Sequence, residues 1–292
     1  MIRFGLVGVN TMHAGVFAGI FNGRDGAPPA LEGGRATSVW GQPDGDVRAL
    51  AQTYGVEQVV SDPITMIGGI DAVLIVDDTG GGGSHARLAR PFIEAGLPTF
   101  IDKPMTLEFA EAVELFDLAE RSGAPLLSAS ALRYAVELEG LHERLATLGP
   151  VSSVVSVGPG DWYYYGVHAV ELYQTVLGPP ADDVAVHRHA FAERDVAVVG
   201  NGAGPTVVVE TLRDASYVFH LTVYCAEGWV DCEVRDPDAF YIGLMAAMME
   251  TVSTGRSPVS REQTLGVLGV LDAGRRSAEL GRAVRLEEVL GV

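Results

Sequence analysis

The sequence has few cysteines, few positive charges and no apolar run long enough to span a bilayer. Two cysteines, Cys225 and Cys232, cannot form the disulfide framework of a small secreted protein, so we expect packed thiols in a reducing cytoplasm. Only 20 Lys and Arg stand against 38 Asp and Glu, a formal net charge of −18. Such an anion repels phosphate backbones and anionic lipid, and we therefore expect neither nucleic acid nor membrane as a partner. The opening Met1-Ile2-Arg3-Phe4 also lacks the pattern of a signal peptide.

Two kinds of active site are missing as well. There is no G-x-S-x-G elbow, which argues against a hydrolase of that type. His187 and His189 alternate without a nearby Cys or carboxylate to complete a set of ligands, so we predict no metal site. What the sequence does have is 48% hydrophobic residues in 292, enough for a substantial core in two domains or one large one.

The first 125 residues alternate between strand and helix patterns. The strands are nearly continuous apolar runs, as in a parallel sheet that helices cover on both faces. This order predicts a doubly wound, Rossmann-type α/β domain over residues 1–125. The predicted strands are 3–9, 36–40, 72–76, 99–101 and 125–128, and the predicted helices are 13–22, 46–54, 84–95 and 107–122.

The pattern changes towards residue 150, and strands then follow one another across short polar turns. We predict an α+β domain over residues 126–292, with an open, mainly antiparallel sheet and closing helices that pack back towards the first domain. The predicted strands are 151–157, 184–189, 206–212, 217–224 and 229–234, and the predicted helices are 168–177, 238–253 and 261–280.

A degenerate dinucleotide motif joins the first strand to the first helix. Gly8 keeps the first glycine of G-x-G-x-x-G, whereas Asn10 and His13 replace the second and third. Asparagine tolerates left-handed geometry, and the helix start still offers N–H groups to phosphate, so the segment including Thr11 and Met12 remains a candidate cofactor site. A glycine-containing turn without a ligand is the alternative interpretation.

The ends of the next two strands supply further candidates. No carboxylate directly follows the second strand to bind ribose hydroxyls; Gln42 and Asp44 are the nearest polar groups, which leaves NAD and NADP both open. After the third strand come Asp78 and Thr79, four glycines, and His85 near the next helix start. We include these residues among the candidates for cofactor binding, although His85 also fits a capping or packing role.

Two segments carry the candidate chemistry. Asp102-Lys103-Pro104 follows a buried strand, and Pro104 biases Lys103 towards an extended conformation that aims its ammonium out of the sheet edge. In the second domain, three tyrosines precede His168 at a helix start, as expected for a pocket with aromatic walls. A surface lysine and an aromatic core cluster are the alternatives.

Taken together, the chain resembles the Gfo/Idh/MocA oxidoreductases, the group of glucose–fructose oxidoreductase and inositol dehydrogenase. Asp102-Lys103-Pro104 looks like the family's Glu-Lys-Pro, the Gly5–His13 turn and the His85 segment fit its first domain, and Gly166-Val167-His168 and the Gly255–Val284 ending fit its second. The resemblance implies a small-molecule substrate, and it implies that Lys103 and His168 face the nicotinamide and the substrate. Lys103 would then polarise the reacting oxygen and His168 would act as general acid and base.

The chain departs from that family's pattern at Asn10, at His13, after the second strand, and at Tyr164, where the family has an aspartate. Tyr164 is therefore a third catalytic candidate. The main hypothesis is an NAD(P)-dependent oxidoreductase of a sugar, cyclitol or related ring. The alternatives are an elimination, isomerisation or cyclisation enzyme on the same scaffold and a non-catalytic binding homologue. An open apolar sheet face also predicts a homodimer or homotetramer.

Overall fold

The computed structural model describes residues 1–42 and 46–291. The chain forms two compact units, which are not the two halves of the sequence. Residues 1–129 and 241–260 form the first, and residues 130–240 and 261–292 form the second. The segment 241–260, predicted as part of a closing helix, thus belongs to the first unit.

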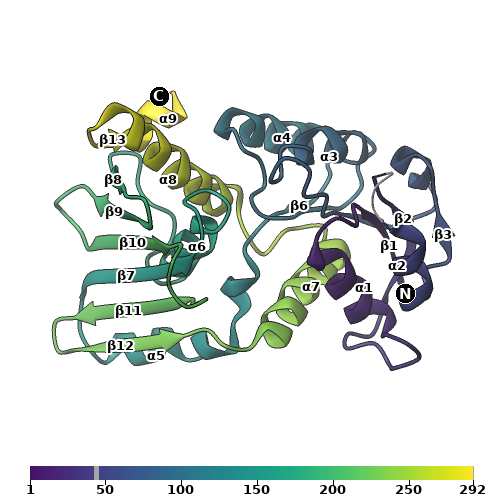
Figure 1. The fold of residues 1–292 in the computed structure, drawn as a ribbon, viewed down its shortest axis with the longest axis horizontal. Coiled ribbons are helices and arrows are strands. Elements are labelled where there is room, and N and C mark those ends of the chain that lie inside the picture. The colour runs from purple at the N-terminus through teal and green to yellow at the C-terminus, as the bar shows by residue number, and fades with distance from the viewer. Residues whose placement is uncertain (43–45, 292) are drawn as a thin grey trace. The chain divides into compact units, whose positions relative to one another are not determined.

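The first unit is built on a parallel six-stranded sheet with the order β3-β2-β1-β4-β5-β6 (Figure 1). This confirms the predicted doubly wound fold, because the strand order reverses direction next to β1. The two-residue strand β3 was not predicted and is too short to show a pattern. The strands are β1 (Ile2–Val7), β2 (Gly34–Trp40), β3 (Gln58–Val59), β4 (Ala72–Ile75), β5 (Thr99–Ile101) and β6 (Leu126–Leu127).

Helices connect these strands, and their ends follow local sequence signals. Thr11 caps α1, Asp46 caps α2, and Gly123 in a left-handed conformation ends α4. Phenylalanines fill the core beneath α1, where the Phe4 and Phe21 rings stack with centroids 4.4 Å apart. The helices are α1 (Met12–Asn22), α2 (Val47–Tyr54), α3 (His85–Glu94), α4 (Phe109–Ser122) and the larger part of α7 (Pro237–Thr254), with a 3₁₀ turn η1 (Pro63–Met66).

The second unit contains a seven-stranded sheet with the order β12-β11-β7-β10-β9-β8-β13 (Figure 1). Its neighbouring strands are antiparallel except for β7 and β10, which run parallel. Helix α6 and the strands β8 and β9 lie between these two strands in the sequence. The mainly antiparallel sheet is confirmed. The strands are β7 (Val151–Pro159), β8 (Ala185–Ala190), β9 (Arg194–Gly200), β10 (Thr206–Leu212), β11 (His220–Cys225), β12 (Gly228–Glu233) and β13 (Val284–Arg285).

Helices cover one face of this sheet. Helix α6 packs on β7 and β10, and α8 packs on β8. On the other face, the side chains of Val198, Tyr224 and Trp229 are exposed, and Tyr224 pairs with Trp229 across β11 and β12. The helices and 3₁₀ turns are η2 (Ala131–Tyr134), η3 (Val136–Leu138), α5 (Leu141–Ala146), α6 (Gly166–Leu177), α8 (Arg261–Leu280) and α9 (Leu286–Leu290).

Two strands of this unit were not predicted, β9 and the two-residue β13. Strand β9 begins with Arg194 and Asp195. These two consecutive charged residues obscure the pattern of alternating buried and exposed residues that follows them. The structure explains the aspartate, because the buried Asp195 carboxylate binds both Arg188 and Arg213. Both cysteines are free thiols. Within the part of the chain that the structure describes, no helix is long and apolar enough to cross a membrane.

Candidate functional site

The turn after β1 brings two backbone segments into close contact. Gly8 has a φ of 108°, and a Cβ atom built on it would lie 2.4 Å from the backbone N and Cα atoms of Asp77. Only glycine fits this conformation and this contact without displacing the backbone. The first glycine of the motif is therefore required by the fold, and it leaves the backbone bare at the carboxyl edge of the sheet.

Asn10, in place of the second glycine, ties this turn to the loop after β4. Its side-chain oxygen accepts a hydrogen bond from the Asp78 backbone N at 2.9 Å, and its amide nitrogen donates to the Thr79 hydroxyl at 3.2 Å. Four predicted cofactor-binding residues, Gly8, Asn10, Asp78 and Thr79, thus come together at one edge of the sheet. The sequence did not indicate that Asn10 would bond to the other two polar residues directly.

Helix α1 begins beside this turn with Thr11 as its N-cap and with Met12 exposed. Its first turn contains no acidic residue. The unpaired N–H groups and positive dipole end of such a helix favour an anion. The start of α1 therefore suits a phosphate group in the way that the motif predicts.

His13, in place of the third glycine, is buried rather than open to a ligand. Its Nδ1 lies 2.5 Å from the Asp102 Oδ2, and its Nε2 lies 2.9 Å from the hydroxyl of Tyr241. Burial alone would raise the pKa of Asp102, but the charge and hydrogen bond of His13, helped by the charges of Lys103 and His85, bring it down to about 2. Asp102 is therefore a carboxylate, and it bonds within the protein.

Lys103 lies directly beyond this carboxylate and is 7% exposed. Its backbone N–H donates to the Asp102 Oδ1 at 2.8 Å. His85, also predicted for cofactor binding, is buried with its Nδ1 2.9 Å from the Pro104 carbonyl oxygen. The two histidines thus hold the residues on either side of Lys103.

Two further candidates, Gln42 and Asp44, follow β2 in the sequence. Gln42 follows the strand at the same edge of the sheet and is partly exposed. Asp44, the other candidate for the ribose, lies outside the described residues. The contacts described for this edge therefore come from the turns after β1, β4 and β5.

In the second unit, His168 is buried at the start of α6. Its Nδ1 lies 2.6 Å from the hydroxyl of Ser130, which precedes η2. A hydroxyl can donate to an unprotonated nitrogen or accept from a protonated one, so this partner suits a histidine that changes its protonation state. Ser130 was not predicted; its place directly after the sixth strand is the signal that could have indicated it.

A second bond from the same segment reinforces this arrangement. Glu171, one helical turn beyond His168, accepts a hydrogen bond from the Arg133 Nε at 2.5 Å and one from the Ser130 backbone N at 3.3 Å. The glutamate side chain is 3% exposed, so the pair is well shielded from water. The η2 segment is thereby fixed against α6 by a buried ion pair.

Aromatic rings surround His168 as the sequence predicted. The Tyr165 ring centroid lies 6.0 Å from that of His168, and the Phe219 centroid lies 5.1 Å from it. Tyr164 packs edge-on against Tyr165, and Tyr217, from the loop between β10 and β11, packs against Tyr165 and Phe219. Tyr164 therefore belongs to this cluster, while its catalytic role remains a prediction.

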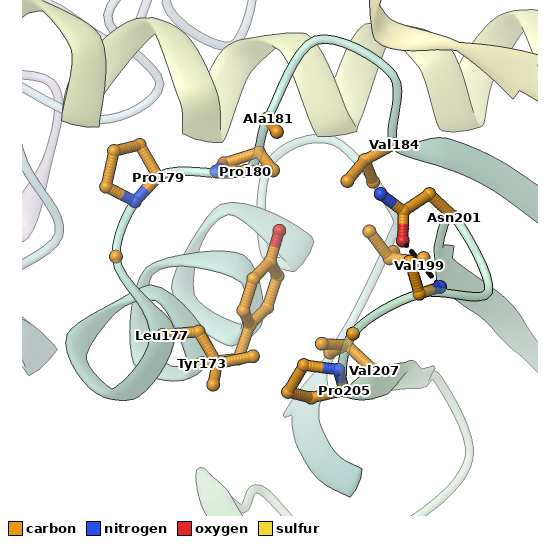
Figure 2. Close-up of a pocket in the computed structure, with 14 residues that line it drawn as sticks. Tyr173, Leu177, Pro179, Pro180, Ala181, Val184, Val199, Asn201, Pro205 and Val207 are labelled. Carbon is orange, nitrogen blue, oxygen red and sulfur yellow. Dashed lines mark hydrogen bonds between the residues drawn. The ribbon is translucent and has the colours of Figure 1, made fainter. Parts of the chain in front are cut away.

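The same unit contains a cavity of about 370 Å³ at the other end of α6. Figure 2 shows the Tyr173 ring in its wall, with valines and prolines around it. Burial raises the pKa of this phenol. Leu177, also in the wall, lies nine residues beyond His168, which is about 13 Å along a helix axis, so the cavity is separate from the His168 cluster. Among residues 1–42 and 46–291, no group of three or more His, Cys, Asp or Glu could hold a metal ion.

We compared the chain with known protein families and structures. Residues 2–130 match the family described as the oxidoreductase family with an NAD-binding Rossmann fold, Gfo/Idh/MocA. The first unit thus carries the family's signature over nearly all of its N-terminal segment. The predicted resemblance to the Gfo/Idh/MocA oxidoreductases is thus confirmed over residues 2–130. The prediction of an NAD(P)-dependent oxidoreductase from this family is confirmed.

Relatives extend the likeness beyond the first unit. The chain is 26% identical over 253 residues to D-xylose 1-dehydrogenase (NADP(+)) 2 of Haloferax volcanii, covering 70% of this chain and 78% of that protein. The crystal structure of myo-inositol 2-dehydrogenase from Lactobacillus plantarum has a TM-score of 0.81 at 16% identity, covering 97% of this chain and 99% of that one. Apo scyllo-inositol dehydrogenase from Lactobacillus casei has a TM-score of 0.83 at 14% identity, covering 98% of each chain. At these identities the two structures establish the fold alone.

Proposed function

We propose that the protein transfers hydride between a nicotinamide cofactor and a carbinol of a sugar, cyclitol or related polyhydroxylated ring. The observation that carries this proposal is the carboxyl edge of the Rossmann sheet, where the bare Gly8 turn and the buried Lys103 belong to one cluster of bonded loops. The D-xylose dehydrogenase among the relatives supports a polyol as the substrate class.

The residues present fit a dinucleotide. The first turn of α1 would accept the pyrophosphate, with Asn10, Thr11 and Met12 alongside. The loop with Asp78 and Thr79 would border the nucleotide. When bound, the nicotinamide supplies or accepts the hydride. The departures from the glycine motif do not remove this fit, because Asn10 and His13 make their bonds within the protein.

The chain's own groups would manage the proton. A carbinol loses hydride readily only as its hydroxyl proton leaves, so a base must lie within hydrogen-bond reach of that oxygen. We propose that Lys103 stabilises the developing alkoxide and that His168 Nε2 takes the proton. The Ser130 hydroxyl would remain hydrogen-bonded to the His168 Nδ1 in both protonation states. The side chains of Tyr164, Tyr165 and Tyr217 form an aromatic cluster. Their flat apolar faces and hydroxyls suit a polyhydroxylated substrate, which has apolar C–H faces and polar edges.

A direct test is to titrate the protein with NADH and NADPH by fluorescence, then to follow nicotinamide absorbance over a panel of pentoses, hexoses and inositols. We expect tight binding of at least one cofactor and turnover with a member of the panel. Lys103→Met and His168→Asn should each lower kcat by about 100-fold or more, the usual range for acid–base groups. Cofactor binding without redox turnover of any polyol would favour a proton-transfer enzyme on this scaffold, and no binding at all would contradict the proposal.

We also propose that the protein self-associates through the exposed sheet face of its second unit. Tyr224 and Trp229 are 45% and 67% exposed there, side by side on paired strands. Large exposed aromatic side chains on a sheet favour burial against a partner. A homodimer or homotetramer, in a cytoplasm where both thiols stay reduced, is the assembly that we expect.

A further inference from the structure

His13 occupies a position where the dinucleotide motif has glycine, and its bonds lead to the candidate catalytic lysine. The imidazole comes from α1, the carboxylate of Asp102 follows β5, and the phenol of Tyr241 comes from α7, all within the first unit. A buried histidine is costly unless it is fully hydrogen-bonded. Here both ring nitrogens of His13 have hydrogen-bond partners, so its burial is compensated within the first unit.

The direction of each bond follows from the chemistry of the groups. Asp102 is ionised and can only accept, so the His13 Nδ1 must carry a proton. In the neutral imidazole, Nε2 then accepts from the Tyr241 hydroxyl; in the imidazolium, Nε2 donates to the phenol oxygen instead. Tyr241 can serve both states, and the bond to Asp102 persists in each.

The carboxylate passes this constraint to Lys103. One Asp102 oxygen is held by His13 and the other accepts the Lys103 backbone N–H at 2.8 Å. The charges of Lys103 and His85 also act on this carboxylate, so the titratable groups around it are His13 from α1, His85 from α3, Tyr241 from α7 and Lys103 itself. Any movement of the Asp102 carboxylate would therefore change both the position of the lysine and the charge beside it.

We propose that His13 is a positioning residue for Lys103, acting through Asp102 and steadied by Tyr241. The proposal rests on the proposed role of Lys103 in hydride transfer. It gives the third motif position a different task from the glycine that it replaces. In this chain, the helix that would bind the pyrophosphate is coupled by hydrogen bonds to the residue that would act on the substrate oxygen.

The test compares His13→Gly, His13→Asn and Asp102→Asn in the full-length protein, by kcat, KM and the pH profile of kcat/KM. His13→Gly should lower kcat by about 10- to 100-fold with little change in KM, as loss of an outer positioning partner does at other sites. Asparagine places an N–H donor near the former Nδ1, so His13→Asn should recover most of the lost rate. His142→Gln, which removes an exposed histidine on α5, is the control and should change nothing.

The pH profile distinguishes positioning from mere stability. Asp102→Asn removes a negative charge that favours the ammonium form of Lys103, so the basic limb of kcat/KM should move to lower pH. His13→Gly leaves that carboxylate without its partner, so the same limb should move to higher pH. If His13→Gly folds poorly, Asp102→Asn still decides the question, because it is nearly isosteric.

Two results would overturn the proposal, and only the second would also refute the proposed role of Lys103 in hydride transfer. Unchanged kcat and unchanged basic limbs in His13→Gly or Asp102→Asn, together with an inactive Lys103→Met, would leave the lysine catalytic but show that His13 does not position it. A fully active Lys103→Met would instead refute the role of the lysine and, with it, any positioning of it.

Discussion

The close contact between Gly8 and Asp77 makes a quantitative prediction for Gly8→Ala. The backbone φ of 108° would strain any L residue, at about 1–2 kcal/mol. The added methyl group would also meet the backbone N and Cα of Asp77 at 2.4 Å, and forced overpacking typically costs about 1–3 kcal/mol. The two effects together should lower the free energy of unfolding by about 2–5 kcal/mol.

Gly26→Ala is the matched control for the first effect alone. Gly26 also has a positive φ, 86°, but a Cβ built there has no neighbour within 4 Å. Gly8→Ala should therefore be the less stable variant by about 1–3 kcal/mol, or about 2–10 °C in Tm for a protein of this size. It should also lose affinity for NADH, whereas Gly26→Ala should not. Equal Tm values for the two variants, measured by circular dichroism, would refute the steric argument.

Further predictions concern charge, the His168 cluster and assembly. The pKa of Asp102 falls from 3.8 to about 2 on folding. Its ionisation should therefore contribute about 2 kcal/mol to the free energy of unfolding above pH 4, and this contribution is lost as the pH falls towards 2. In urea unfolding, Asp102→Asn should lack this part of the acid dependence. Ser130→Ala removes the partner of His168 Nδ1 and should lower kcat by about 10-fold and shift its pH profile, whereas a purely structural role would lower Tm alone. Trp229→Asp should convert the oligomer to monomers in static light scattering, and an unchanged mass would exclude that sheet face as the interface.

Much of the first unit could be predicted from the sequence, because its buried parallel strands are continuous apolar runs between helices with clear caps. The grouping of Gly8, Asp78, Thr79 and Lys103 followed from the same logic, since the carboxyl ends of parallel strands meet at one edge. The partners of the two histidines could not be predicted in this way. Tyr241 reaches His13 across 228 positions and Ser130 reaches His168 across 38, and no periodicity encodes such contacts.

The second unit shows a related limit. Its strands were found where apolar residues alternate, and β9 was missed because it begins with Arg194 and Asp195. The carboxylate of Asp195 is satisfied by Arg188 and Arg213 from neighbouring segments, which a local pattern does not reveal. The sequence could thus predict elements, but it could not predict pairs formed between elements.

The return of residues 241–260 to the first unit has a consequence for biosynthesis. The ribosome releases the first 129 residues more than 100 positions before the segment that completes them. Until then, α1 lacks its contact with Tyr241, whose ring packs against Phe17 in the folded unit. A nucleotide-binding fragment cut after residue 129 should therefore be an incomplete fold, and a transplantable version would need the distant helix fused back to it.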